Sequence, residues 1–173
     1  KYIPLDKRSW YLSLGSEARI RYEYFDEFNF GAGPQDDDGY LLQRYLAHAD
    51  VHFGQRVRVF TQLQSAIGSW RNGGPRPTDD DRLDVHQAFL DLRFGDDAKS
   101  LTFRVGRHEM EFGSGRLISA GEGLNVRRSF DGVRVIHRRG PWLINGQVNK
   151  LVSIKRGLFN DGPDWSQTFW GVG

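Results

Sequence analysis

The sequence lacks cysteine, has little lysine and contains no long apolar run. Without cysteine the chain can form no disulfide framework and can carry out no thiolate chemistry. No stretch approaches the roughly 20 apolar residues that a membrane-spanning helix needs, so a helical membrane protein is excluded. The net charge of +2 provides no strong field for nucleic acid, which we do not expect as a partner.

The positive charge is carried almost entirely by arginine. Only five of the 24 basic residues are lysine, so 19 are arginine. Arginine presents a planar fork that grips a carboxylate bidentately, whereas lysine acts as a point charge. A genome rich in arginine codons would give the same composition. Composition alone therefore does not distinguish anion recognition from codon usage, and the positions of the arginines in the sequence are needed to do so.

Period-two alternation runs through most of the chain and predicts half-buried β-strands. In residues 12–24, for example, Leu12, Ile20 and Tyr22 share one face, while Arg19 and Arg21 lie on the other. The other strands that the alternation predicts are 41–53, 57–67, 84–94, one from 101, one around 133–135, 142–149 and a last one from about 167. Segments of about 8–13 residues suit tilted transmembrane strands better than the strands of soluble sheets, which have roughly 5–6 residues.

The alternation has exceptions, which are expected at rims, bulges or packed parts of a lumen. The apolar side chains that fall on polar faces are Leu42, Leu46, Phe60, Val85 and Phe89. The polar side chains that fall on apolar faces are Gln43, His86 and Arg107, the last of these unless a bulge at Gly106 turns it round.

The connections between these segments alternate in length. The long ones are 25–39, 68–82, 113–131 and 153–165, and the short ones are 54–56, 95–100 and 140–141. Outer-membrane barrels have short periplasmic turns and longer extracellular loops, whereas a soluble sandwich has no reason to alternate them. The pattern predicts an outer-membrane barrel with its N-terminus in the periplasm.

Aromatic residues gather at both ends of the predicted strands, as in the two girdles that lie at lipid headgroups. Those near the short turns are Trp10, Tyr11, Phe53, Phe94, Phe103 and Trp142. Those near the long loops are Tyr22, Tyr24, Tyr40, Trp70, Phe112 and Phe130. Aromatic residues that cap the core of a soluble barrel remain the alternative.

If the apolar faces meet lipid, the polar faces line one lumen. The residues predicted to line it are Arg19, Arg21, Arg44, Arg58, Arg93, Arg104, Arg134, Arg138, Glu17, Asp91, Gln62, Gln64 and Gln87. Rings of arginine select anions, interspersed acids prevent a polyanion from binding too tightly, and the amides can hydrogen-bond sugar hydroxyls. The alternative is an internal ladder of arginine and carboxylate that only stiffens the wall.

The connection 113–131 is the least repetitive part of the chain. We predict that it folds inward as a constriction that carries Arg116, Arg127 and Arg128, and an ordinary extracellular loop is an equally open alternative. The acid runs at 36–38 and 79–81 could hold calcium, but solvated loop charge is the favoured interpretation because no spacing resembles an EF-hand.

No catalytic or cofactor site is expected. His48 and His52 share a face without an evident third ligand, so we predict no metal site there. Glu109 and Glu111 could suggest glycoside chemistry, but charges at a barrel rim explain them better. The sequence contains no nucleophile elbow and no phosphate loop. We predict a protein that is not an enzyme.

Seven stretches, in order along nearly the whole chain, carry a family resemblance. They are LGSEARIRYEY (14–24), DGYLLQRY (38–45), FTQLQS (60–65), DVHQAFLD (84–91), RVGR (104–107), GSGRLI (113–118) and NVRRSFDG (125–132). Together they resemble the alginate export family of outer-membrane porins. The resemblance implies an 18-stranded monomeric barrel with an electropositive pore for polyuronate, set in outer-membrane lipid and served by periplasmic export partners.

The chain, taken as one barrel segment over 1–173, supplies seven strands and the start of an eighth. A closed eight-stranded barrel would be filled by side chains and could not pass a polymer. We therefore predict part of a larger antiparallel up-and-down transmembrane β-barrel, an outer-membrane porin that exports an anionic polysaccharide by passive diffusion through an arginine-lined pore. The alternatives are a general porin for anions or small solutes, and a soluble β-barrel domain that binds carbohydrate.

Overall fold

The structure is a computed structural model that describes residues 2–6, 9–27, 30–32, 39–112 and 114–173. Its strands are β1 (Tyr2–Asp6), β2 (Trp10–Glu23), β3 (Tyr40–Phe53), β4 (Val57–Ser69), β5 (Asp81–Gly95), β6 (Lys99–His108), β7 (Phe130–Arg139), β8 (Trp142–Ser153), β9 (Gly162–Pro163) and β10 (Phe169–Val172). In this part of the chain no helix is long and apolar enough to cross a membrane. The all-β prediction is confirmed.

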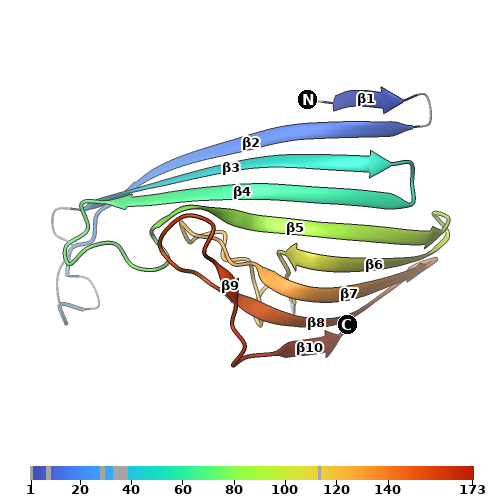
Figure 1. The fold of residues 1–173 in the computed structure, drawn as a ribbon. Coiled ribbons are helices and arrows are strands. Elements are labelled where there is room, and N and C mark those ends of the chain that lie inside the picture. The colour runs from blue at the N-terminus through green and yellow to red at the C-terminus, as the bar shows by residue number, and fades with distance from the viewer. Residues whose placement is uncertain (1, 7–8, 28–29, 33–38, 113) are drawn as a thin grey trace.

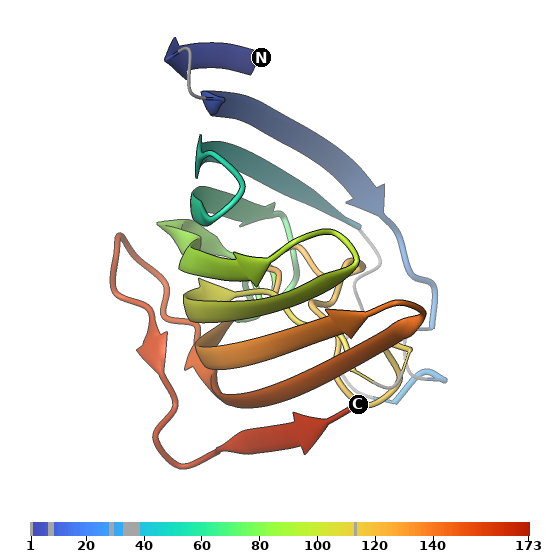
Figure 2. The same cartoon turned by 90° about the vertical axis from the view of Figure 1, so that its right-hand side faces the viewer.

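All ten strands belong to one antiparallel sheet in which neighbours in sequence are neighbours in space. The order is β1-β2-β3-β4-β5-β6-β7-β8-β10, with β9 paired to the end of β8. Figure 1 shows the strands running alternately in opposite directions across the picture, with short connections at the right-hand end and long ones at the left. Viewed from the short-turn end, the sheet is an arc that runs from β1 to β10 and is not closed (Figure 2).

The predicted strands are present, and most extend further than their alternation indicates. β2 and β3 have 14 residues each and β5 has 15. The short turns at 54–56 and 140–141 fall where they were predicted. β1 was not predicted, because Pro4 and a register shift between Pro4 and Asp6 interrupt its alternation, as is common in strands at a sheet edge.

One face of the sheet is apolar and exposed. Successive cross-strand partners on it are Trp10, Phe53, Val57, Leu92, Phe103 and Val135. Ile20 is 68% exposed and Val148 is 57% exposed. Since no other layer of described residues covers these side chains, the aliphatic faces do not pack against each other across a dry interior.

Most of the buried apolar side chains lie instead on the opposite, polar face. Leu42 and Leu46, two of the exceptions to the alternation, are almost fully buried there, together with Phe89. The connection between β6 and β7 contributes Met110 and Val126 to the same buried set. In Figure 2 this connection, drawn in yellow after β6, lies inside the arc of the sheet. The core therefore lies between the polar face and one long connection.

Two other exceptions have a local cause. Gln62 pairs with Gln87 but Leu63 pairs with Val85, so His86 is an extra residue in β5. This β-bulge returns Val85 to the apolar face, and the prediction for these two positions was wrong. Arg107 remains on the apolar side, paired in register with Ala88, and neither ladder of β6 shifts at Gly106.

The aromatic girdles are only partly as predicted. Trp10 and Phe53 form an edge-to-face pair on the apolar face, with ring centroids 5.3 Å apart. Tyr11 lies on the polar face, where it stacks on His52. Phe112, Tyr40 and Phe130 were also assigned wrongly: Phe112 packs against Phe169, and the other two are buried. Alternation could not detect this, because residues at strand ends pack against connections.

Candidate functional site

The polar face of the sheet gathers the residues that were predicted to line a pore. Arg19 lies opposite Arg44, and Arg104 is flanked by Asp91 and Arg134 on the neighbouring strands. The period of two places the other predicted strand residues on this same face. The face has two regions, which we call the covered half and the open half.

The covered half lies under the connection 109–129 and is centred on Arg44. The Arg44 side chain is 0% exposed, and its Nη2 lies 2.7 Å from Glu17 Oε1 and 2.6 Å from Glu122 Oε1. Arg19 donates to the backbone oxygens of Glu122 and Leu124, at 2.7 and 2.5 Å. These two arginines therefore hold the connection rather than facing open space.

Glu122 is the acidic residue of this connection that the arginines share. The hydrogen bond from Arg44 lowers the pKa of Glu122, and the charges of Arg127, Arg44 and Arg19 act in the same direction against a smaller effect of burial. Sequence reasoning missed Glu122, although it is the one acidic residue between Glu111 and Asp131. A lone acid in a basic segment was the available signal.

Asn125 and its neighbours attach the connection to backbone. Asn125 Nδ2 donates to the backbone oxygens of Gln43 at 3.0 Å and Asp79 at 2.8 Å. The amide of Val126 donates to the oxygen of Thr78 at 2.9 Å. Asn125 is almost fully buried, so this connection is fixed to β3 and to the segment before β5.

Of the three arginines predicted for a constriction, Arg127 is fixed and the other two are exposed. Arg127 lies 2.7 Å from Glu109 and 2.9 Å from Glu122, and its amide donates to Gln64 Oε1. Arg116 and Arg128 are exposed. The described residues of the connection lie on the polar face. Residue 113 is outside the described residues. That the connection narrows a pore stays a prediction.

The open half lies nearer the short turns and is a ladder of alternating charge. Arg58 grips Asp50 through two hydrogen bonds of 2.8 and 3.1 Å. Arg104 grips Asp91 in the same way, at 2.7 and 2.8 Å. Arg58 also lies 3.7 Å from Asp91, which joins the two pairs. The ladder that we considered as an alternative is therefore present.

Two aromatic rings support this ladder. Phe60 and Phe89 stack with their centroids 5.1 Å apart. The Arg104 guanidinium lies 3.8 Å from the Phe89 centroid, and that of Arg58 lies just over 5 Å from both rings. Cation–π contacts of this kind position an arginine without neutralising it. They explain why two phenylalanines occupy a polar face.

Arg134 differs from these arginines because its hydrogen-bond partner is neutral. Its Nη2 donates to Asn145 Oδ1 at 3.0 Å, and no ion pair to it is present among the described residues. A hollow of about 420 Å³ opens beside the ladder, lined in part by Tyr11, His52 and Arg58. Tyr11 and His52 are further residues that sequence reasoning did not assign to this site.

The remaining predicted residues lie towards the ends of the strands or between the two halves. Arg21 pairs with Glu23 at 2.6 Å, and Arg93 pairs with Asp97 at 2.8 Å in an exposed turn. Arg138 is exposed. Gln87 donates to Gln62 at 2.8 Å, so these two amides bind each other.

Of the two acid runs, the one at 79–81 differs from solvated loop charge. The run at 36–38 lies outside the described residues. Asp79 pairs with Arg71 at 2.8 Å, and both Asp79 and Asp81 are buried, so the favoured interpretation was wrong for them. His48 stacks on Phe60. Among the described residues, neither His48 nor His52 belongs to a group of three or more side chains that could hold a metal ion.

Comparison with known proteins gives one match. The model of a family described as alginate export matches residues 10–172, which includes both halves of the polar face. This match confirms the resemblance predicted from the sequence. Neither the curated proteins nor the solved structures contain a match to the chain.

Proposed function

The chain belongs to the alginate export family, whose members are outer-membrane porins, and from this premise we propose that it forms part of the wall of a barrel that exports an anionic polysaccharide. The chemistry of the two sheet faces supports this proposal. One face exposes aliphatic and aromatic side chains such as Ile20 and Val148, and the other carries arginines, carboxylates and amides. Lipid suits the first face, and a hydrated pore suits the second.

The barrel would be completed by pairing at both edges of the sheet. β1 and β10 form these edges, and an unpaired backbone edge is too costly to remain in lipid. Further strands would pair with these edges and close a monomeric barrel wide enough for a polymer. The complete barrel would have 18 strands, as the resemblance implies. The short turns would then face the periplasm and the long connections the cell exterior.

The open half would be the part of this wall that meets the polymer. Within the described part of the chain Arg134 bonds to a neutral amide alone, so its charge is available to a sugar carboxylate. Arg104 and Arg58 are bonded to Asp91 and Asp50, so each contact with the polymer must compete with an internal carboxylate. Such competition permits release and lets the polymer move by diffusion. No catalytic residue is required for this function.

Ion selectivity in planar lipid bilayers tests the proposal. Replacing Arg134 by Gln in the intact protein should reduce anion selectivity, measured as a smaller reversal potential in a salt gradient. Arg139→Gln is the matched control, because Arg139 lies on the same strand but on the opposite face. Equal reversal potentials in the Arg134 variant and the unmodified protein would contradict the assignment of the pore.

Block by polymers separates polysaccharide export from a general anion porin. A polyuronate should reduce the conductance at concentrations where neutral dextran of the same length does not. Arg134→Gln should weaken the block, whereas Arg139→Gln should leave it unchanged. Equal block by both polymers would favour a general porin for small solutes. A protein that stays dispersed and folded without detergent would favour a soluble carbohydrate-binding domain instead.

A further inference from the structure

The connection between β8 and β10 crosses to β5 and pairs with the start of that strand through backbone hydrogen bonds. β6 pairs with β5 only as far as Ala88, so the edge of β5 before that residue is open. The amide of Leu83 donates to the oxygen of Gly157 at 3.3 Å, and the amide of Phe159 donates to the oxygen of Leu83 at 2.9 Å. Residues 157–161 therefore lie beside the first residues of β5.

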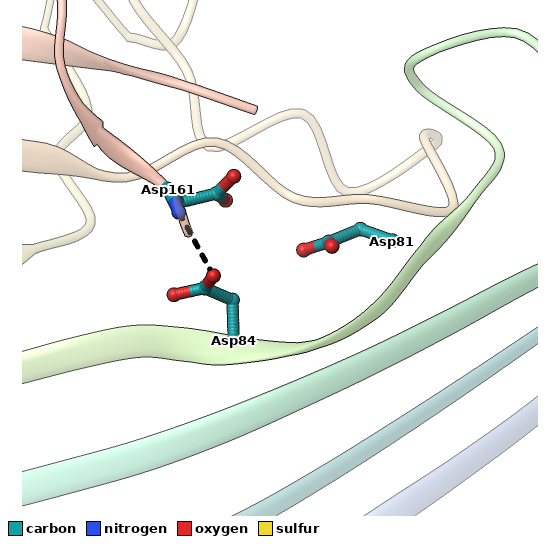
Figure 3. Close-up of side chains that lie close together, drawn as sticks. All are labelled: Asp81, Asp84 and Asp161. Atoms are coloured by element: carbon teal, nitrogen blue, oxygen red, sulfur yellow. Dashed lines mark hydrogen bonds between the residues drawn. The ribbon is translucent and has the colours of Figure 1, made fainter. Parts of the chain in front are cut away.

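This crossing brings three carboxylates together. Asp81 and Asp84 lie on β5, Asp161 lies on the crossing segment, and one ligand oxygen from each lies within 4.8 Å of the others. Figure 3 shows the carboxylate of Asp81 directed toward the other two. Asp84 Oδ2 accepts from the amides of Asn160 and Asp161 at 2.7 and 3.0 Å. The backbone thus holds the two segments in this arrangement.

Asp81 is the member of the cluster that needs a partner. It is 1% exposed, and no hydrogen bond of normal geometry from any described residue reaches either of its carboxylate oxygens. The peptide of Gly157 lies near it without completing such a bond. A carboxylate buried without a partner is strongly unfavourable. This carboxylate would be stabilised by a cation between the three side chains.

The arginine nearest to the cluster, Arg107, is bonded mainly to another carboxylate, that of Asp131. Arg107 Nη1 lies 3.7 Å from Asp84 Oδ1, but the same guanidinium grips Asp131 through hydrogen bonds of 2.9 and 3.0 Å. The charge of Lys155 also acts on Asp161, but Lys155 forms no ion pair with the cluster among the described residues. Among the described residues, the three carboxylates therefore share one partial guanidinium contact, from Arg107.

We propose that Asp81, Asp84 and Asp161 bind a divalent cation, and that the cation is calcium. Calcium takes six to eight oxygen ligands in flexible geometry, whereas magnesium demands a near-ideal octahedron and retains its waters. The cluster supplies carboxylate oxygens only, from two segments far apart in the sequence. The bound ion fastens the connection 154–168 to β5. This inference does not depend on the transport function.

Thermal unfolding of the intact protein in detergent micelles tests the site, with calcium chloride as the probe after treatment with EDTA. Affinities of roughly 10⁻⁴–10⁻³ M are typical of extracellular calcium modules, so 10 mM calcium should raise Tm by about 5 °C. Asp81→Asn should abolish this rise, and its Tm in EDTA should equal or exceed that of the unmodified protein, because a buried unpaired charge is gone. Asp97→Asn, in an exposed turn, is the matched control and should respond like the unmodified protein.

A second variant keeps the test valid if Asp81→Asn does not fold. Asp161→Asn alters the crossing segment alone and should also lose the calcium-dependent rise in Tm. Calorimetric titration of the unmodified protein with calcium chloride should show saturable binding that both variants lack. Absence of saturable binding to the unmodified protein, or retention of it in the variants, would overturn the site. An equal response to magnesium chloride would overturn the assignment to calcium.

Discussion

The covered and open halves of the polar face are built from the same residue types but use them differently. In the covered half, Arg19 and Arg44 donate to the connection 109–129 through its backbone oxygens and Glu122. In the open half, Arg58 and Arg104 donate to carboxylates of the sheet itself. The first arrangement attaches a loop, and the second leaves a charged wall beside a hollow.

The difference shows that an arginine on a polar face does not by itself indicate contact with solute. Arg44 has two carboxylate partners and no exposed surface, so its charge is compensated within the protein. Arg134 has a neutral partner and a neighbouring arginine, so its charge is available. We therefore expect substitutions in the covered half to change stability, and substitutions in the open half to change selectivity.

The largest effect is expected for Arg44→Ala. Removing this buried guanidinium leaves Glu17 and Glu122 without their shared partner, and breaking a buried ion pair typically costs about 3–5 kcal/mol. We expect a loss of about 3 kcal/mol, at the lower end of that range, because both glutamates keep contact with water. The free energy of unfolding in urea, measured on the intact protein in lipid vesicles, checks this.

Arg93→Ala is the control for that experiment. Arg93 pairs with Asp97, whose side chain is 87% exposed, and exposed ion pairs contribute roughly 0–1 kcal/mol. Trypsin should also cleave the connection faster at Arg116 and Arg128 in the Arg44 variant, because the connection is held less firmly. The Arg93 variant should be cleaved at the rate of the unmodified protein. Equal losses of stability in the two variants would show that the covered half is not fastened through Arg44.

Sequence reasoning could predict the faces of the sheet but not the division of its polar face. Side-chain direction in a strand is local, so alternation was sufficient to place Arg19 and Arg134 correctly. The contact between Arg44 and Glu122 joins residues 78 positions apart, and no period in the sequence encodes it. The extra residue at His86 was missed because one bulge reverses the alternation beyond it.

Asp91→Asn should have the second-largest effect on stability and should raise anion selectivity. Asp91 accepts two hydrogen bonds from Arg104 and lies near Arg58. Losing hydrogen bonds to a charged group costs about 2 kcal/mol, and neutralising the carboxylate leaves more positive charge beside the hollow. Urea unfolding and the reversal potential of the intact protein in a salt gradient measure the two effects.

Asp131→Asn is the matched control for Asp91→Asn. Asp131 also accepts two hydrogen bonds from one arginine, Arg107, but this pair lies in register on the apolar side. It should lose a similar amount of stability and leave the reversal potential unchanged. A rise in anion selectivity in both variants, or in neither, would show that the open half is not the surface that solutes meet.

The smallest effect is expected from the protonation of Glu122. Hydrogen bonding to Arg44 lowers the pKa of Glu122 below its ordinary value of 4.5. Because the pKa is lower in the folded protein, this stabilisation is complete above that value and is lost as the pH falls through the lowered pKa. Acidification from pH 7 to pH 3 should therefore loosen the connection. The protection of the Val126 and Arg128 amides against hydrogen exchange should fall about two- to fivefold, in keeping with a largely exposed acid.

Glu122→Gln should produce the same loss of protection at pH 7 and should reduce the further loss at low pH. Glu17→Gln is the matched control, since Glu17 shares Arg44 with Glu122 but belongs to β2. Its substitution should leave more of the pH dependence in place, because the link between the sheet and the connection is intact. If the Glu122 variant kept the full pH dependence of the unmodified protein, the acid that fastens the covered half would have to be another one.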